Sequence, residues 1–263
     1  FGSRIVILLF LIGIYFLPSI IYPFVIKKSL TPKFGGYKRA ISISNFYHHT
    51  YPKSAKIYDL RAVANYMERN WEQALSDYKN ALKVSGKKFL PQDVVRFENL
   101  LLLQKKVTNP QDAIDIFNEY ITQKNMTVLQ KSQMLWIKSI FSIENGIYDS
   151  VMQDYEDLLD SLDKKDTKNM FYIACDKAYM MYLMQDYNMA LEAYGILISY
   201  AESNKSDYEK ELKNLYAERG WAKKRLGDEN GANYDFMFSK IPSDELSQYE
   251  PSFKKQEFVI DEL

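Results

Sequence analysis

A three-residue pattern recurs five times along the 263-residue chain. In its first copy, Ala74 is followed four positions later by Tyr78 and seven positions later by Ala81. Residues with these spacings share one face of an α-helix. Each copy therefore predicts a helix with a small residue that lets a neighbouring helix approach and an aromatic residue that packs beside it. Successive copies begin 39, 38, 39 and 42 residues apart, a period typical of stacked helical hairpins. The other copies are Ala113/Phe117/Tyr120, Val151/Tyr155/Leu158, Ala190/Tyr194/Leu197 and Ala232/Phe236/Ser239.

This pattern resembles the tetratricopeptide repeat, a helix–turn–helix unit of about 34 residues. That family also places a small residue in the first helix of each unit, and the matching positions here hold Ala62 and Gly220. The second and third copies depart from the family pattern, because they carry Leu101 in the first helix and Val151 in the second. The resemblance covers roughly residues 55–240 and implies an all-α, right-handed superhelical solenoid of about five hairpins.

Turn residues divide this repeat domain, which we place at residues 54–240, into its hairpins. An Arg precedes the small residue and an Asp precedes the aromatic in both the first and the fifth hairpin. We therefore expect a structural ion pair in each, Arg61 with Asp77 and Arg219 with Asp235. The expected hairpins cover residues 54–84, 92–122, 128–163, 168–202 and 207–240.

The N-terminal stretch, residues 5–26, contains 22 residues without a charge. As a helix it would measure about 33 Å, enough to cross a hydrocarbon core of about 30 Å. We therefore predict a transmembrane anchor over residues 1–28. A cleaved signal peptide and a buried core helix are the alternative interpretations, and the length of the apolar run favours neither.

A basic segment follows, which we interpret as a juxtamembrane linker over residues 29–53. Residues 27–58 contain seven Lys or Arg and no acid, whereas residues 59–263 carry a net charge of −8. Basic residues beside a span favour the cytoplasmic face, or the matrix or stromal face of an organelle, and attract anionic headgroups. An ordinary solvated linker is the alternative. The candidate membrane-surface residues are Lys27, Lys28, Lys33, Lys38 and Arg39.

The sequence contains no motif that indicates catalysis. It has no glycine-rich phosphate loop, no nucleophile elbow and no zinc-binding helix motif. The two adjacent His and the single Cys175 do not predict a metal site or a nucleophile, and no cofactor is expected. The net acidic repeat region also argues against nucleic-acid binding. Residues 241–263, which contain Pro242 and Pro251, are interpreted as a polar cap or loose tail.

The resemblance implies a groove lined by the first helix of each hairpin, where a partner peptide or helix binds. Aromatic and basic side chains there are typical anchors for a protein segment. For each ring, packing between helices is an equally good interpretation. The predicted groove residues are Tyr66, Met67, Lys105, Lys106, Trp136, Ile140, Tyr172, Tyr179, Tyr182, Trp221, Lys224 and Arg225.

Together these features predict a non-catalytic, single-pass membrane protein that serves as a scaffold for protein partners, as a subunit of a larger membrane complex. An assembly factor or chaperone-like accessory protein for a membrane or secretion complex is the alternative. An enzyme with a peptide or glycan in the groove is a third possibility, which would require clustered acids there.

Overall fold

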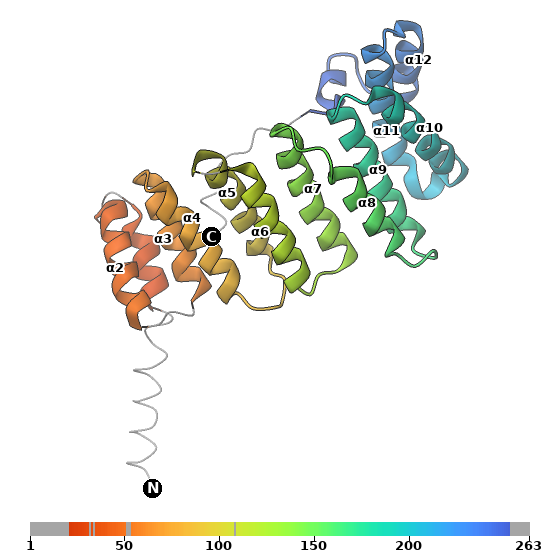
Figure 1. Ribbon diagram of the computed structural model, residues 1–263. Helices are drawn as coiled ribbons and strands as arrows, with labels where there is room; N and C mark the ends of the chain where they lie inside the picture. Colours follow the sequence, from red (N-terminus) through yellow and green to blue (C-terminus); the bar gives the residue numbers. More distant parts are fainter. Residues whose placement is uncertain (1–20, 32, 34, 51–53, 108, 253–263) are drawn as a thin grey trace. The chain divides into compact units, whose positions relative to one another are not determined.

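A computed structural model describes residues 21–31, 33, 35–50, 54–107 and 109–252. These residues form an all-α fold, with helices joined by short turns and no strand among them (Figure 1). One isolated bridge joins Lys88 to Asn125. Within this described part, no helix is long and apolar enough to cross a membrane. Most of the predicted anchor, residues 1–20, lies outside the described residues, and residues 21–29 are helical.

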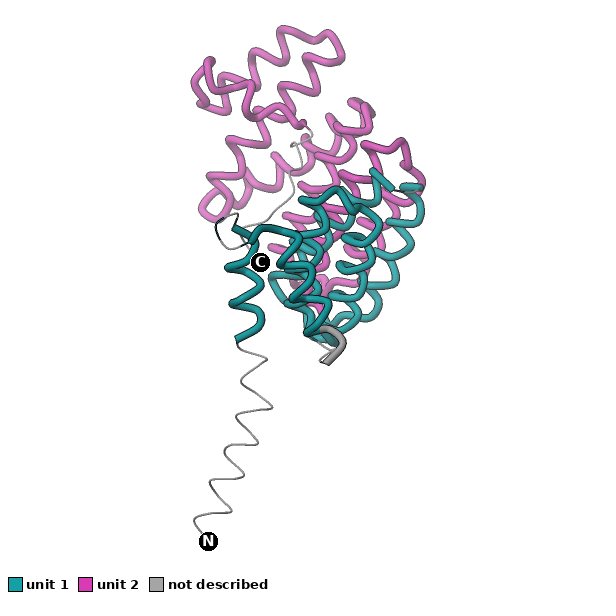
Figure 2. The backbone as a smooth tube through the Cα atoms, turned by 90° about the vertical axis from the view of Figure 1, so that its left-hand side faces the viewer, with its two compact units in different colours: residues 1–125, 256–263 teal, residues 126–255 magenta. Residues whose placement is uncertain are grey.

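The chain divides into two compact units (Figure 2). The first comprises residues 1–125 with 256–263, and the second comprises residues 126–255. The helices of the first unit are α2 (Gly36–Thr50), α3 (Ala55–Met67), α4 (Trp71–Val84), α5 (Pro91–Val107) and α6 (Pro110–Gln123). Those of the second are α7 (Val128–Glu144), α8 (Val151–Asp160), α9 (Thr167–Leu183), α10 (Tyr187–Ser203), α11 (Lys205–Arg225) and α12 (Glu229–Ser239), followed by a short 3-10 helix, η2 (Leu246–Tyr249).

Helices α3 to α12 fall in pairs on the five segments expected to be hairpins. Local chemistry explains where the second helices of the last two pairs begin, because an Asp side chain caps each one. Asp186 Oδ1 accepts the amide of Met189 at 3.2 Å, and Asp228 Oδ1 accepts that of Gly231 at 2.8 Å. Gly227, just before the last cap, has a φ of +83°, a conformation that glycine adopts without steric cost.

The positions of the recurring pattern form the core. All five small or apolar first members and four of the five aromatic second members are fully buried. Such burial contributes about 1.5–3 kcal/mol for each large apolar side chain. These nine first and second members, each 0% exposed, are Ala74, Tyr78, Ala113, Phe117, Val151, Tyr155, Ala190, Tyr194 and Ala232.

The fifth aromatic, Phe236, packs against the glycine that replaces the usual small side chain. A Cβ atom added at Gly220 would lie 2.6 Å from Phe236 Cε1. The ring also meets Trp221 edge-on, with 5.4 Å between ring centroids. The small residue of the first helix therefore makes room for the ring of the second, as the spacing predicts.

Both expected ion pairs within hairpins are confirmed. Arg61 Nε donates to Asp77 at 3.0 Å, and Arg219 Nη2 donates to Asp235 at 2.7 Å. Asp235, fully buried, also pairs with Lys223 at 2.9 Å.

The segment that was expected to be a linker contains a helix. Helix α2 begins at Gly36, the second of two adjacent glycines, and packs on the first hairpin. Ala40 and Tyr47 of α2 share a buried cluster with Ile57 and Leu60 of α3. An apolar face too short to stand out among basic residues explains why the sequence pattern missed this helix.

Candidate functional site

The described end of the chain, residues 246–252, folds back onto α9 and α11 in the second unit. Tyr179 of α9 makes two hydrogen bonds to its backbone: the hydroxyl donates to the carbonyl oxygen of Ser252 and accepts from its amide, both at 3.1 Å. On α11, Trp221 Nε1 donates to the carbonyl oxygen of Leu246 at 3.0 Å. All three hydrogen bonds are made to backbone atoms, so they do not depend on the side chains of the segment.

One contact in the segment depends on a side chain. The carboxylate of Glu250 accepts a hydrogen bond from the Tyr182 hydroxyl at 2.8 Å and from Arg225 Nε at 3.0 Å. Arg225 Nη2 bonds the same carboxylate, and its Nε also donates to the Tyr182 hydroxyl at 3.2 Å. A guanidinium and a phenol thus converge on one carboxylate, and Pro251 beside it is buried.

We call the four residues that hold this segment, Tyr179, Tyr182, Trp221 and Arg225, the tail-binding face. Two further predicted groove residues support it. The Trp136 ring lies 4.8 Å from the Tyr179 ring, and Lys224 Nζ lies 4.9 Å from the centre of the Trp221 ring. Eight of the residues that the sequence predicted for the groove belong to helices α7, α9 and α11, and the structure brings six of them together. The other two are Ile140 and Tyr172.

Ile140 and Tyr172 serve other contacts in the second unit. Ile140 is 6% exposed and belongs to the core. The Tyr172 hydroxyl donates to Glu211 at 2.7 Å, and this bond raises the pKa of Tyr172 to about 12. Both side chains therefore stabilise packing within the unit.

Burial also changes the acidity of groups near the tail-binding face. It raises the pKa of Tyr182 and Tyr179, so both hydroxyls keep their protons and can donate at neutral pH. It raises the pKa of Glu218 on α11 to about 8 and that of Asp176 on α9 to about 6. Ser132 donates to Asp176 at 3.0 Å, which opposes that rise without cancelling it.

Four predicted groove residues lie in the first unit. Lys106 Nζ stands 4.6 Å from the Trp71 ring centre and 5.7 Å from that of Tyr66. Arg69, Trp71 and Lys106 line a surface hollow of about 400 Å³. Met67, beside this cluster in the sequence, is 38% exposed, and Lys105 is also exposed.

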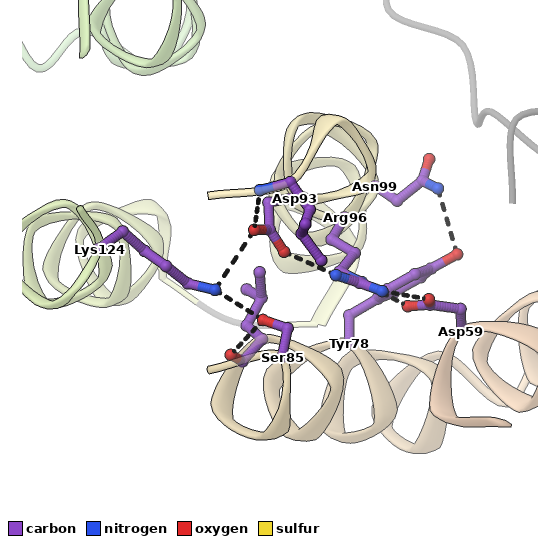
Figure 3. Close-up of polar contacts among 9 residues, drawn as sticks. Asp59, Tyr78, Ser85, Asp93, Arg96, Asn99 and Lys124 are labelled. Atoms are coloured by element: carbon purple, nitrogen blue, oxygen red, sulfur yellow. Dashed lines mark hydrogen bonds and ion pairs between the residues drawn. The ribbon is translucent and has the colours of Figure 1, made fainter. Parts of the chain in front are cut away.

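Sequence reasoning missed a buried polar network in the first unit (Figure 3). Arg96 of α5 donates to Asp59 of α3 at 2.8 Å and 2.6 Å, and to Asp93 at 2.6 Å. Lys124 Nζ, at the end of α6, contacts Asp93 at 3.3 Å and Ser85 Oγ at 2.7 Å. The only signal in the sequence was the Asp93–Arg96 spacing, which puts both on one helix face.

This network has the features of a structural element. Its two acids and two bases balance in charge, and each is less than 9% exposed. Arg96 holds both carboxylates, and the Leu90 amide and Lys124 also bind Asp93. Its members come from α3, from α5 and from the residues that follow α4 and α6, so the network ties the first two hairpins together.

We also searched the described residues for a metal site, a reactive cysteine and the predicted basic surface. They contain no group of three or more side chains that could hold a metal ion. Burial raises the pKa of the Cys175 thiol far above its usual value, which keeps the sulfur unreactive at neutral pH. The five basic residues expected at the membrane surface, from Lys27 to Arg39, are all exposed.

Comparison with models of known protein families finds no match. Comparison with curated protein sequences finds no match either. The likeness to tetratricopeptide repeats therefore depends on the residues of this chain alone.

Proposed function

We propose that this chain is a non-catalytic, membrane-anchored scaffold that binds a segment of a partner protein on the tail-binding face. In this proposal the five helical hairpins are tetratricopeptide-like repeats that stack as a right-handed superhelical solenoid. Their first helices would line a groove, and the tail-binding face on α9 and α11 would be part of it.

One observation carries the proposal: the face already holds a segment of protein, the 3-10 helix η2 and the extended residues after it. Tyr179 and Trp221 bond its backbone, and Tyr182 and Arg225 bond its carboxylate. Tyr, Trp and Arg are the side chains that most often anchor protein interfaces. A surface that satisfies the backbone of one extended segment has the chemistry to satisfy that of another.

The anchor and the basic segment support a place at a membrane. Residues 5–26 carry no charge, and five exposed basic residues follow between positions 27 and 39. Each basic side chain near an anionic leaflet contributes about 1 kcal/mol of attraction. We propose that the repeats lie on the cytoplasmic side, or on the matrix or stromal side, and that the chain is a subunit of a membrane complex.

The test is quantitative capture from detergent-solubilised membranes with the full chain as bait. Tyr179→Phe and Arg225→Ala remove contacts of the tail-binding face, and Lys213→Ala changes an exposed residue of the same helix α11. We expect at least one protein whose recovery falls with both face variants and stays unchanged with Lys213→Ala. If no protein distinguishes the face variants from the control, the proposed function is wrong.

A further inference from the structure

The C-terminal segment meets the tail-binding face as a bound peptide would. After η2 the backbone is extended at Glu250, with φ −69° and ψ 123°. Three of its backbone groups bond side chains of the face: the Leu246 carbonyl oxygen and both the amide and the carbonyl oxygen of Ser252. Glu250 contributes the one charged side-chain contact. Recognition therefore combines backbone groups, from the start of η2 and from the extended residues after it, with a single carboxylate.

The strength of these contacts suits a displaceable segment. The Arg225 side chain is 51% exposed and that of Glu250 is 22% exposed, so solvent screens their ion pair. An exposed pair of this kind contributes little to stability, and each hydrogen bond to the segment contributes modestly. Fixing the segment costs conformational entropy that offsets part of this gain. A second segment with the same chemistry can therefore compete for the face.

We propose that residues 246–252 act as a built-in competitor for the partner site. The partner would supply a short helical turn and then an extended stretch that carries a carboxylate where Glu250 stands, followed by a compact residue in the place of Pro251. Its carboxylate would bind Arg225 and Tyr182, and its backbone would bind Tyr179 and Trp221. The partner must displace residues 246–252, so this segment lowers the partner's apparent affinity for the face.

The charge around the site selects this ligand over others. Arg225 and Lys224 are adjacent exposed cations at the end of α11, where they also meet the negative end of the helix. A segment with a basic residue in place of the carboxylate would face both cations. The tyrosine hydroxyls add selectivity, because Tyr182 donates to a carboxylate while Tyr179 serves one amide and one carbonyl.

The inference rests on the proposed function, and a peptide-binding experiment tests it separately. The probe is a fluorescent peptide with the sequence of residues 245–252, Glu-Leu-Ser-Gln-Tyr-Glu-Pro-Ser. Its anisotropy is measured with the full, detergent-solubilised chain. Glu250→Lys in the chain places a cation against Arg225 and should release the tail. Glu250→Ala removes the carboxylate without adding charge, and Glu245→Lys is the matched control at an exposed position of the same segment.

We expect both Glu250 variants to bind the peptide about tenfold more tightly than the unmodified chain and the Glu245→Lys control, which corresponds to roughly 1.4 kcal/mol of lost competition. A peptide with Gln in place of its second Glu should bind the opened chain several-fold more weakly. Arg225→Ala combined with Glu250→Ala should abolish that difference between the two peptides. Circular dichroism confirms that each variant stays helical.

Equal binding to the unmodified and opened chains, or no binding to either, would overturn the proposal. Equal binding of the Glu and Gln peptides would also overturn it, because the carboxylate would then be irrelevant. These outcomes differ from a failure of the scaffold function. If a partner is captured through the face but the peptide does not bind, the scaffold function stands and the proposed competition is wrong. If the peptide competes with residues 246–252 but no partner is captured, the competition stands and the scaffold function is wrong.

Discussion

The Arg225 guanidinium and the Glu250 carboxylate form an ion pair with 3.0 Å between Nε and Oε1, although 25 residues separate them in the chain. This pair ties the segment after the last hairpin to the end of α11. Part of the segment that was expected to be a polar cap or loose tail thus occupies the face on which the sequence predicts partner binding. The contacts that define the face are therefore the same contacts by which the chain's own segment binds it.

Replacing Gly220 with Ala tests the packing of the last hairpin. The new Cβ would lie 2.6 Å from Phe236 Cε1, so the ring or the helix must shift. Overpacking of this kind costs about 1–3 kcal/mol of unfolding free energy. Urea unfolding followed by circular dichroism measures the loss.

Gly195→Ala is the matched control, since an added Cβ at that position of α10 meets no atom within 4 Å. There we expect a gain of about 0.5–1 kcal/mol from the better helix propensity of Ala. Equal effects at the two glycines would show that the contact with Phe236 does not matter.

The buried network of the first unit predicts a large loss for Asp93→Ala. Asp93 holds both Arg96 and Lys124, and the change would leave two buried cations without their shared acid. Breaking a buried pair in this way costs about 3–5 kcal/mol. Glu156→Ala breaks the exposed pair with Lys177 and should cost less than about 1 kcal/mol. Chemical denaturation compares the two variants; similar losses would mean that the network is not important for stability.

The carboxyls of Glu218 and Asp176 predict a pH dependence of stability. Burial raises their folded pKa values to about 8 and about 6, whereas the unfolded chain ionises near 4. The unfolded state therefore loses protons first, and stability falls as the pH rises from about 4 to 8.

We expect Glu218→Gln to raise the unfolding free energy at pH 8 by on the order of 1–3 kcal/mol and to flatten its decline between pH 5 and 8. Glu209→Gln, at an exposed position of the same helix, should leave the profile unchanged. Thermal or urea unfolding across this pH range checks both variants. An unmodified chain that becomes more stable from pH 5 to pH 8, with no effect of Glu218→Gln, would contradict the assignment.

The proposed membrane anchor predicts that the N-terminal stretch holds the chain in the membrane. The full chain should stay in the membrane pellet after an alkaline carbonate wash. Leu11→Arg together with Ile12→Arg should release it, because each Arg near the centre of a span costs about 2.5–3.5 kcal/mol of insertion. Leu129→Arg, at an exposed position of α7, is the control. Release of the unmodified chain by carbonate would refute the anchor.

The sequence predicted those parts of the fold that depend on local periodicity. Ala74 and Tyr78 are four residues apart on one helix, so their shared buried face follows from spacing alone. The Arg219–Asp235 pair was predictable for a related reason, since the same residues recur at the same places in the first hairpin.

Contacts between distant residues with no repeated signal could not be predicted. Asp59 and Arg96 are 37 positions apart, and single charged residues on helices usually face solvent. Glu250 is one of many acids in a segment rich in charge and proline, and nothing in its neighbourhood indicates Arg225 as its partner. Helix α2 was missed because its glycines and basic residues resemble a linker.

Hydrogen exchange of the segment 246–252 in the full chain tests the central claim most directly, because both proposals require that the face hold this segment. The amide of Ser252, bonded to the Tyr179 hydroxyl, should exchange slowly in the unmodified chain. Tyr179→Phe and Arg225→Ala should each speed exchange across the segment, while Lys213→Ala should not. Rapid exchange in the unmodified chain, unchanged by the face variants, would contradict the claim.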